Sequence, residues 1–130
     1  MQFGRITRRL AEAERPILTQ HGLTMWEYVV LASLARRPAE TQLALAEAIG
    51  YDKTRLIGLL DRLGSEGLIA RDPDPTDRRA RIVALTASGR QRVTAARRDI
   101  HAMEDELLAG LSSKERAMLD TALARLADAA

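Results

Sequence analysis

Residues 41–63 contain two short segments with helical apolar spacing joined by a tight turn, and this pattern restricts the possible folds more than any other. The apolar positions are Leu45, Ala46 and Ile49 in the first segment and Leu56, Leu59, Leu60 and Leu63 in the second. Thr41 and Asp52 are favourable N-caps for the two segments, and Gly50 suits the turn between them. Two short helices joined in this way are typical of a helix-turn-helix.

The pattern changes from helical to strand-like after Gly67. Residues 68–71 and 81–85 are short apolar runs, and residues 72–80 between them are polar and rich in proline. We expect a β-hairpin with a tip longer than a two-residue turn. A hairpin beside a helix-turn-helix predicts a mainly α fold with a small β-hairpin wing (α+β), that is, a winged helix-turn-helix.

The segment between the first helix and the helix-turn-helix has its own boundary signals. His21-Gly22 should end the first helix, and Pro16 should kink that helix or restart it. Thr24 and Glu27 form a capping box for a helix that runs to about Leu34, before Arg37-Pro38 breaks it. Thr86 and the box at 112–115 should begin the last two helices.

The first and the last two helices carry narrow apolar seams outside the wing and helix-turn-helix. The predicted dimerisation residues are Phe3, Ile6, Leu10, Ile100, Leu107, Leu119, Leu123 and Leu126. A core needs only part of these seams, so a second copy of the chain would cover the rest. The alternative is that the helices fold back on their own domain. We therefore expect one domain over 1–130, with 23–87 as the DNA-binding lobe and 1–22 and 88–130 as a dimerisation region.

Composition excludes several classes of function. The chain has no cysteine, which excludes disulfides, cysteine-based zinc sites and thiol redox sensing. It lacks a signal pattern and a membrane-length apolar run, so a cytoplasmic protein is expected. His101 and Asp105 resemble half a metal site, but a solvated helix face explains them, and no metal or cofactor is expected. Residues 1–98 hold 17 basic and 11 acidic side chains, which favours a polyanionic partner.

Five motifs together resemble one family. They are Thr-Gln-x-x-Leu-Ala (41–46), Gly-x-Asp-Lys-Thr (50–54), Leu-x-Arg-Leu-x-x-x-Gly-Leu-Ile-x-Arg (60–71), Asp-Pro-x-Asp-Arg-Arg (74–79) and Val-x-Leu-Thr-x-x-Gly (83–89). From about Leu23 to Leu126 the chain resembles the MarR family of winged-helix regulators. The resemblance implies a homodimer with recognition helices in successive major grooves and wings in flanking minor grooves. It also implies a pocket for a small aromatic or phenolic effector between the dimer helices and the DNA-binding lobe.

The second helix of a helix-turn-helix presents its N-terminal residues to base edges. The candidate DNA-binding residues in this helix are Lys53, Thr54, Arg55, Gly58 and Arg62. Arg55 is the candidate base reader, because arginine to guanine is the commonest specific contact. Many relatives have Thr-Arg where this chain has Ile57-Gly58, so the operator of a relative cannot be transferred to it.

The wing supplies a second set of cations at Arg78, Arg79 and Arg81, which suit a narrow minor groove. The family resemblance implies that Asp77 forms an ion pair with Arg79. Thr41 and Gln42 are expected to contact phosphate at a helix N-terminus. Arg71 is equally compatible with DNA contact and with a structural role at the base of the wing.

These patterns predict a sequence-specific DNA-binding regulator, expected to be a repressor, that acts as a homodimer on an inverted repeat and is released by a small ligand. The candidate effector-pocket residues are His21, Trp26, Arg5, Arg8 and Arg15, although Trp26 also suits a core position. An enzyme is disfavoured by the absence of a nucleophile or phosphate-binding motif. A winged helix that serves only as a protein-interaction module is the other alternative, and the basic wing argues against it.

Overall fold

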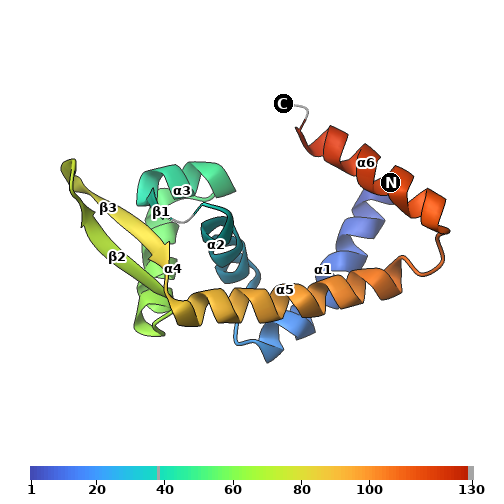
Figure 1. The fold of residues 1–130 in the computed structure, drawn as a ribbon, viewed down its shortest axis with the longest axis horizontal. Helices are drawn as coiled ribbons and strands as arrows, with labels where there is room; N and C mark the ends of the chain where they lie inside the picture. Colours follow the sequence, from blue (N-terminus) through green and yellow to red (C-terminus); the bar gives the residue numbers. More distant parts are fainter. Residues whose placement is uncertain (38, 129–130) are drawn as a thin grey trace.

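The structure, a computed structural model, describes residues 1–37 and 39–128 and consists of helices around a small antiparallel sheet (Figure 1). The elements are α1 (Gln2–Gln20), α2 (Met25–Arg36), β1 (Ala39–Thr41), α3 (Gln42–Ile49), α4 (Lys53–Ser65), β2 (Ile69–Asp74), β3 (Asp77–Leu85), α5 (Ala87–Leu107) and α6 (Ser113–Asp128). The predicted fold class, mainly α with a β-hairpin wing, is confirmed.

Side-chain caps set the helix starts at the predicted residues. The Thr24 hydroxyl accepts the backbone N–H of Glu27, and the Glu27 carboxylate accepts the backbone N–H of Thr24 at 2.9 Å. Thr41 caps α3 by accepting the N–H of Ala44 at 3.1 Å. Gly50 ends α3 in the left-handed conformation with φ of 66°. Helix α2 continues two residues past the predicted end, and Pro38 of the expected break lies outside the described residues.

Helix α1 is continuous through Pro16, so the predicted restart at this residue is wrong. A proline in a helix removes one backbone hydrogen bond and leaves the carbonyl four residues earlier without its donor. Both Glu12, which carries that carbonyl, and Pro16 are exposed. Water can therefore satisfy the carbonyl, which lowers the cost of continuing the helix.

The wing is longer and its tip tighter than the sequence pattern predicts. Strand β3 lies between β1 and β2, with antiparallel pairing on both sides, and only Pro75 and Thr76 separate β2 from β3. The expected long tip is wrong because Asp74 closes the turn: its Oδ1 accepts the backbone N–H and the hydroxyl of Thr76 at 2.9 and 2.8 Å. Pro73 is tolerated in β2 because this strand forms an edge of the sheet.

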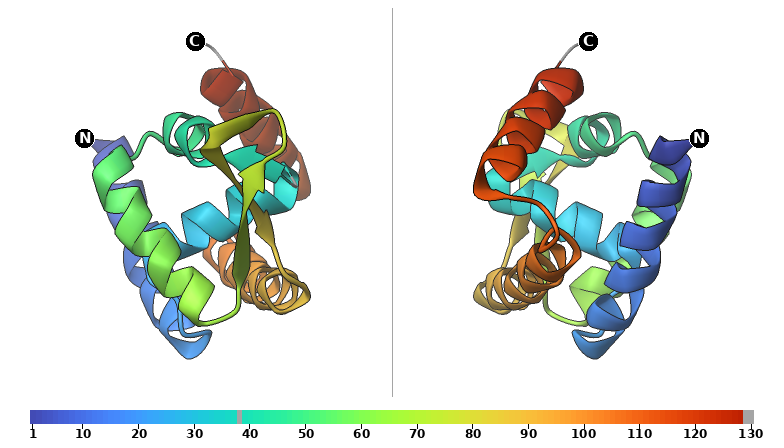
Figure 2. Two further views of the ribbon diagram at one scale, coloured as in Figure 1. Left: turned by 90° about the vertical axis from the view of Figure 1, so that its left-hand side faces the viewer. Right: turned by 90° about the vertical axis from the view of Figure 1, so that its right-hand side faces the viewer.

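A single aliphatic core lies between α2, α3, α4, the sheet and the first half of α5. The most buried side chains include Leu31, Leu34, Leu45, Leu60 and Val83. Helix α5 runs from this lobe past α1 and ends near α6, which lies at the far end of the molecule (Figure 1). Figure 2 shows the two ends face on, with the wing and α4 toward the viewer in its left panel and α6 in its right panel. Ile100 of α5 belongs to the core, with 7% of its surface exposed.

The start of α5 is locked against the turn between α4 and β2. The Thr86 hydroxyl donates to the Gly67 carbonyl at 2.6 Å, and the Thr86 N–H donates to the Leu68 carbonyl at 3.1 Å. A Cβ added at Gly89 would lie 2.0 Å from the Leu68 oxygen, so only glycine fits there. This contact explains the Leu-Thr-x-x-Gly motif at 85–89 and fixes the wing relative to α5.

Candidate nucleic-acid interface

Helix α4 presents to solvent a face that, apart from Ile57, carries no large apolar side chain. Its buried side chains are Leu56, Leu59, Leu60 and Leu63. The predicted DNA-binding residues on the other face, Lys53, Thr54, Arg55, Gly58 and Arg62, are all exposed. Asp52 fixes the first turn, since its carboxylate accepts the N–H of Arg55 at 3.0 Å. The helix therefore has a capped N-terminus and exposed cationic side chains that a partner can reach.

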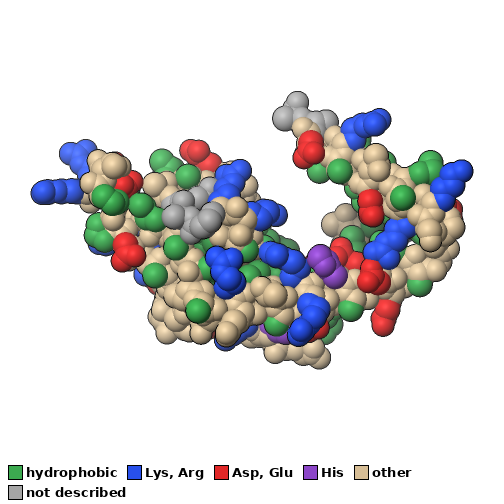
Figure 3. Space-filling model, in the orientation of Figure 1, with side chains coloured by type: hydrophobic (Ala, Val, Ile, Leu, Met, Phe, Trp, Pro, Cys, Tyr) green, Lys and Arg blue, Asp and Glu red, His purple; other side chains and the backbone are tan. Residues whose placement is uncertain are grey.

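The wing also carries exposed cations. Arg78, Arg79 and Arg81 lie on β3 close to the tip and are exposed, and Lys or Arg side chains project from this end of the molecule (Figure 3). Asp77 contacts the backbone of Arg79 and not its guanidinium: the carboxylate accepts the Arg79 N–H at 3.0 Å. The expected side-chain ion pair is absent from the described residues. Hydrogen bonds from Thr76 lower the pKa of Asp74, so the turn is closed by an ionised carboxylate.

One groove brings α3, α4 and the wing together. It has a volume of about 460 Å³. Its lining includes Thr41, which caps α3, Gln42 and Leu43 of α3, Lys53 and Ile57 of α4, and Asp74, Asp77, Arg79 and Arg81 of the wing. Thr41 keeps a hydroxyl proton to donate, because its oxygen is the acceptor in the α3 cap. Five of the ten predicted DNA-binding residues thus converge on one surface, and the others lie on the exposed face of α4 or, in the case of Arg78, at the wing tip.

An ion pair that the sequence did not specify joins the wing to α4. Arg71 of β2 lies 2.7 Å from the carboxylate of Asp61 on the exposed face of α4. Arg71 is therefore a structural link at the base of the wing. The two residues are ten apart in the chain, and only the packing of β2 against α4 brings them together.

A second cavity, of about 530 Å³, lies between α1 and the start of α2. Its lining is mostly apolar and includes Leu10, Leu18, Leu23, Met25, Glu14 and Arg15. Of the five candidate effector residues, only Arg15 is part of this lining. Trp26 instead packs on Tyr51 with ring centroids 4.5 Å apart, and His21 lies 2.6 Å from the Asp99 carboxylate of α5.

Glu14 is the acidic group of the α1–α2 cavity. Its carboxyl is half-buried, and burial together with the nearby Glu104 raises its pKa. The cavity therefore combines an apolar wall, a guanidinium and a carboxyl that takes up a proton more readily than usual.

Nothing else in the described part of the chain suggests catalytic or metal chemistry. Residues 1–37 and 39–128 contain no cluster of three side chains suited to a metal ion. Asp105, the partner considered for His101, instead pairs with Arg116 of α6. No described helix is long and apolar enough to cross a membrane.

A capped recognition helix, a basic wing and a groove between them define a winged-helix DNA-binding protein. Residues 23–80 match the MarR family. The chain is 34% identical over 112 residues to a putative transcriptional regulatory protein for the hcr operon of Thauera aromatica, covering 86% of this chain and 68% of the relative. The chain belongs to the MarR family: it is a DNA-binding transcriptional regulator and not an enzyme.

Two solved structures show the same fold with a partner. A mutant of Escherichia coli MarR complexed with operator DNA matches with a TM-score of 0.81 and 25% identity, covering 96% of this chain and 90% of that chain. The PcaV transcriptional regulator of Streptomyces coelicolor, in complex with its natural ligand, matches with a TM-score of 0.74 and 29% identity, covering 97% and 92%.

Proposed function

We propose that this protein is a transcriptional repressor that binds an inverted-repeat operator as a homodimer and leaves it when a small ligand binds. The observation that supports the proposal is that a DNA-binding surface and an apolar surface lie at opposite ends of α5. The DNA-binding groove and the wing lie at one end of α5, and a mostly apolar groove between α1, α5 and α6 lies at the other (Figure 1).

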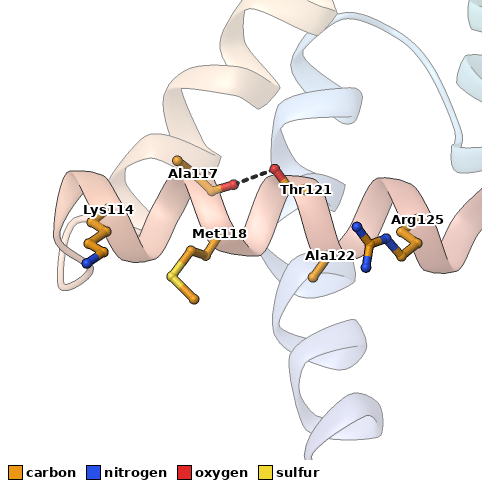
Figure 4. A pocket seen from close by; sticks show the side chains of 6 residues that line it. All are labelled: Lys114, Ala117, Met118, Thr121, Ala122 and Arg125. Carbon is orange, nitrogen blue, oxygen red and sulfur yellow. Dashed lines mark hydrogen bonds between the residues drawn. The ribbon is translucent and has the colours of Figure 1, made fainter.

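Helix α6 supports the dimer. None of its 16 residues is buried in its own chain. An isolated helix of this length is marginally stable in water, so α6 needs a surface to pack on. Leu123 and Leu126 are 49% and 63% exposed. Met118 and Ala122 lie along another open side of the helix, between Lys114 and Arg125 (Figure 4).

The two ends of the chain form the surface that a second copy would cover. A mostly apolar groove of about 650 Å³ runs between α1, α5 and α6. Six of the eight predicted dimerisation residues line it: Phe3, Ile6, Leu10, Leu107, Leu119 and Leu123. The other two differ from each other: Leu126 is exposed on α6 outside the groove lining, whereas Ile100 packs in the core of its own chain. We therefore assign dimerisation to 1–22 and the C-terminal part of the chain, without Ile100.

Two-fold symmetry of such a dimer imposes two-fold symmetry on the operator. Each copy would place α4 in a major groove, with half-site centres roughly 10 bp or a multiple apart. Lys53, Thr41 and Gln42 would contact phosphates, Arg55 a base, and Arg79 the flanking minor groove. Residues 23–87 then act as the DNA-binding lobe.

The cavity between α1 and α2 is the proposed effector site, as the ligand complex of PcaV suggests by analogy. Its apolar lining suits an aromatic body, and Arg15 suits an anionic group. A ligand there would contact α1 of the dimerisation region and α2 of the DNA-binding lobe together. Binding would therefore change the spacing of the two recognition helices and release the operator.

Equilibrium sedimentation with a DNA-binding assay tests the dimer. Leu123→Asp should convert the dimer to monomer and weaken operator binding with it, because it places a charge in the apolar groove. Ala124→Asp is the matched control, since it adds the same charge at an exposed position of α6 outside the groove lining. A wild-type protein that sediments only as a monomer contradicts the proposal. A dimer that binds no duplex would favour the protein-interaction module.

A further inference from the structure

Two large apolar side chains are exposed inside the basic groove. Leu43 at the start of α3 is 51% exposed, and Ile57 of α4 is 49% exposed. Both line the groove together with Lys53, Arg79 and Arg81. Single exposed apolar residues are common, but two in a groove built for a polyanion lie where DNA would cover them.

Ile57 holds a specific place on α4. Residues four apart share a helix face, so Ile57 lies with Lys53 on the side of α4 that faces the wing. Arg55 lies on the other flank, and Gly58 stands between the two flanks. Gly58 has no side chain, and a Cβ added there would meet nothing within 4 Å. Ile57 is therefore the one large apolar side chain that α4 exposes, with an open space beside it.

The base edges of the major groove offer one apolar group, the C5-methyl of thymine. We propose that Ile57 recognises this methyl group and so requires thymine at one symmetric pair of operator positions. The inference rests on the proposed operator binding, because it needs α4 to lie in a major groove. The three cations of this groove, Lys53, Arg79 and Arg81, outnumber its two carboxylates, Asp74 and Asp77, which favours a polyanionic partner such as DNA.

The competing explanation is that Ile57 only packs against sugars of the DNA backbone. That contact would contribute affinity but would not distinguish bases. Deoxyuridine distinguishes the two explanations, because it lacks the methyl group of thymidine and keeps every hydrogen-bonding group. Only recognition of the methyl group predicts that this replacement weakens binding.

The experiment begins with a duplex that the full chain selects from a random pool. Each thymine of this duplex is then replaced by deoxyuridine at symmetric positions, and binding is measured at fixed salt. Burying one methyl group corresponds to about fourfold in affinity. We expect one symmetric pair whose replacement weakens wild-type binding by about fourfold for each half-site.

Three variants assign the effect to a side chain. Ile57→Ala should bind the thymine duplex more weakly and lose the difference between thymine and deoxyuridine. Ile57→Val keeps a branched apolar side chain and should retain most of the difference. Leu43→Ala, the matched control in the same groove, should retain all of it. Thermal melting should show that all three fold, because both side chains are half exposed.

The outcomes separate this inference from the proposed function. Wild type that binds the selected duplex but tolerates deoxyuridine at every position overturns the inference and leaves operator binding intact. A thymine effect that disappears in Leu43→Ala and persists in Ile57→Ala also overturns it. If the protein selects no duplex at all, operator binding and the inference fail together.

Discussion

The guanidinium of Arg71 lies 2.7 Å from the carboxylate of Asp61, which joins wing strand β2 to the exposed face of recognition helix α4. Asp61 is 60% exposed and Arg71 29%, so the pair contributes at most about 1 kcal/mol to stability. The ion pair has a larger effect on the net charge of the exposed face of α4. Arg71 neutralises a carboxylate on the helix face that would otherwise repel DNA phosphates.

Arg71→Gln should weaken DNA binding because it leaves Asp61 without a partner. Asp61→Asn in the same chain should restore most of the affinity, since it removes the uncompensated charge. Neither change should lower the free energy of unfolding by more than about 1 kcal/mol. Binding assays on the four members of this double-mutant cycle check the prediction. If Asp61→Asn rescues nothing, Arg71 contacts DNA directly.

Arg55 and Arg79 should differ in their effects on DNA binding. Arg55→Ala should cost about 1–3 kcal/mol on the operator and flatten base preference at one symmetric pair of positions. Arg79→Ala should weaken operator and random duplex alike. It should also reduce the slope of log affinity against log salt by about 0.9 for each phosphate charge no longer neutralised. Salt titrations on operator and scrambled duplex measure both, and a reversed pattern would exchange the two roles.

Gly89→Ala should destabilise the fold strongly. Its Cβ would lie 2.0 Å from the Leu68 carbonyl oxygen, a backbone atom that cannot move without displacing the start of β2. Overpacking of this kind costs about 1–3 kcal/mol or more. Gly58→Ala is the control, because its Cβ meets nothing and alanine stabilises a helix interior by about 0.5–1 kcal/mol. Urea unfolding that shows equal stability for the two variants would refute the close contact.

Glu14→Gln should stabilise the protein at neutral pH. The pKa of Glu14 is raised in the folded chain by burial and by Glu104, so ionising this carboxyl costs folding free energy. The cost is present above the raised pKa and disappears as pH falls through it toward about 4.3, the ordinary value. The stability advantage of Glu14→Gln should therefore shrink as pH falls. Unfolding curves at several pH values test this, with Glu12→Gln on the exposed side of α1 as the control.

The helix boundaries of the DNA-binding lobe could be predicted because each depends on a few neighbouring residues. Thr24, Thr41, Asp52 and Thr86 cap the helices that their local patterns indicate, and Gly50 makes the turn. The candidate DNA-binding residues followed from the same boundaries, since a helix start fixes which side chains its first turns present. The tip of the wing was less predictable, because the carboxylate of Asp74 shortens a turn that proline content suggests is long.

The amino-acid sequence by itself determined the winged-helix class, because apolar periodicity, caps and turns act over a few residues. Tertiary structure decided the contacts between residues distant in the chain. Strand β1 has three residues and exists only because it pairs with β3, and no local signal marked it. The place of Ile100 in the core, the Asp61–Arg71 pair and the exposure of Ile57 beside the wing depend likewise on how α4, α5 and the sheet pack. A periodic pattern shows that a residue is on an apolar face, but only packing decides whether its own chain or a partner covers it.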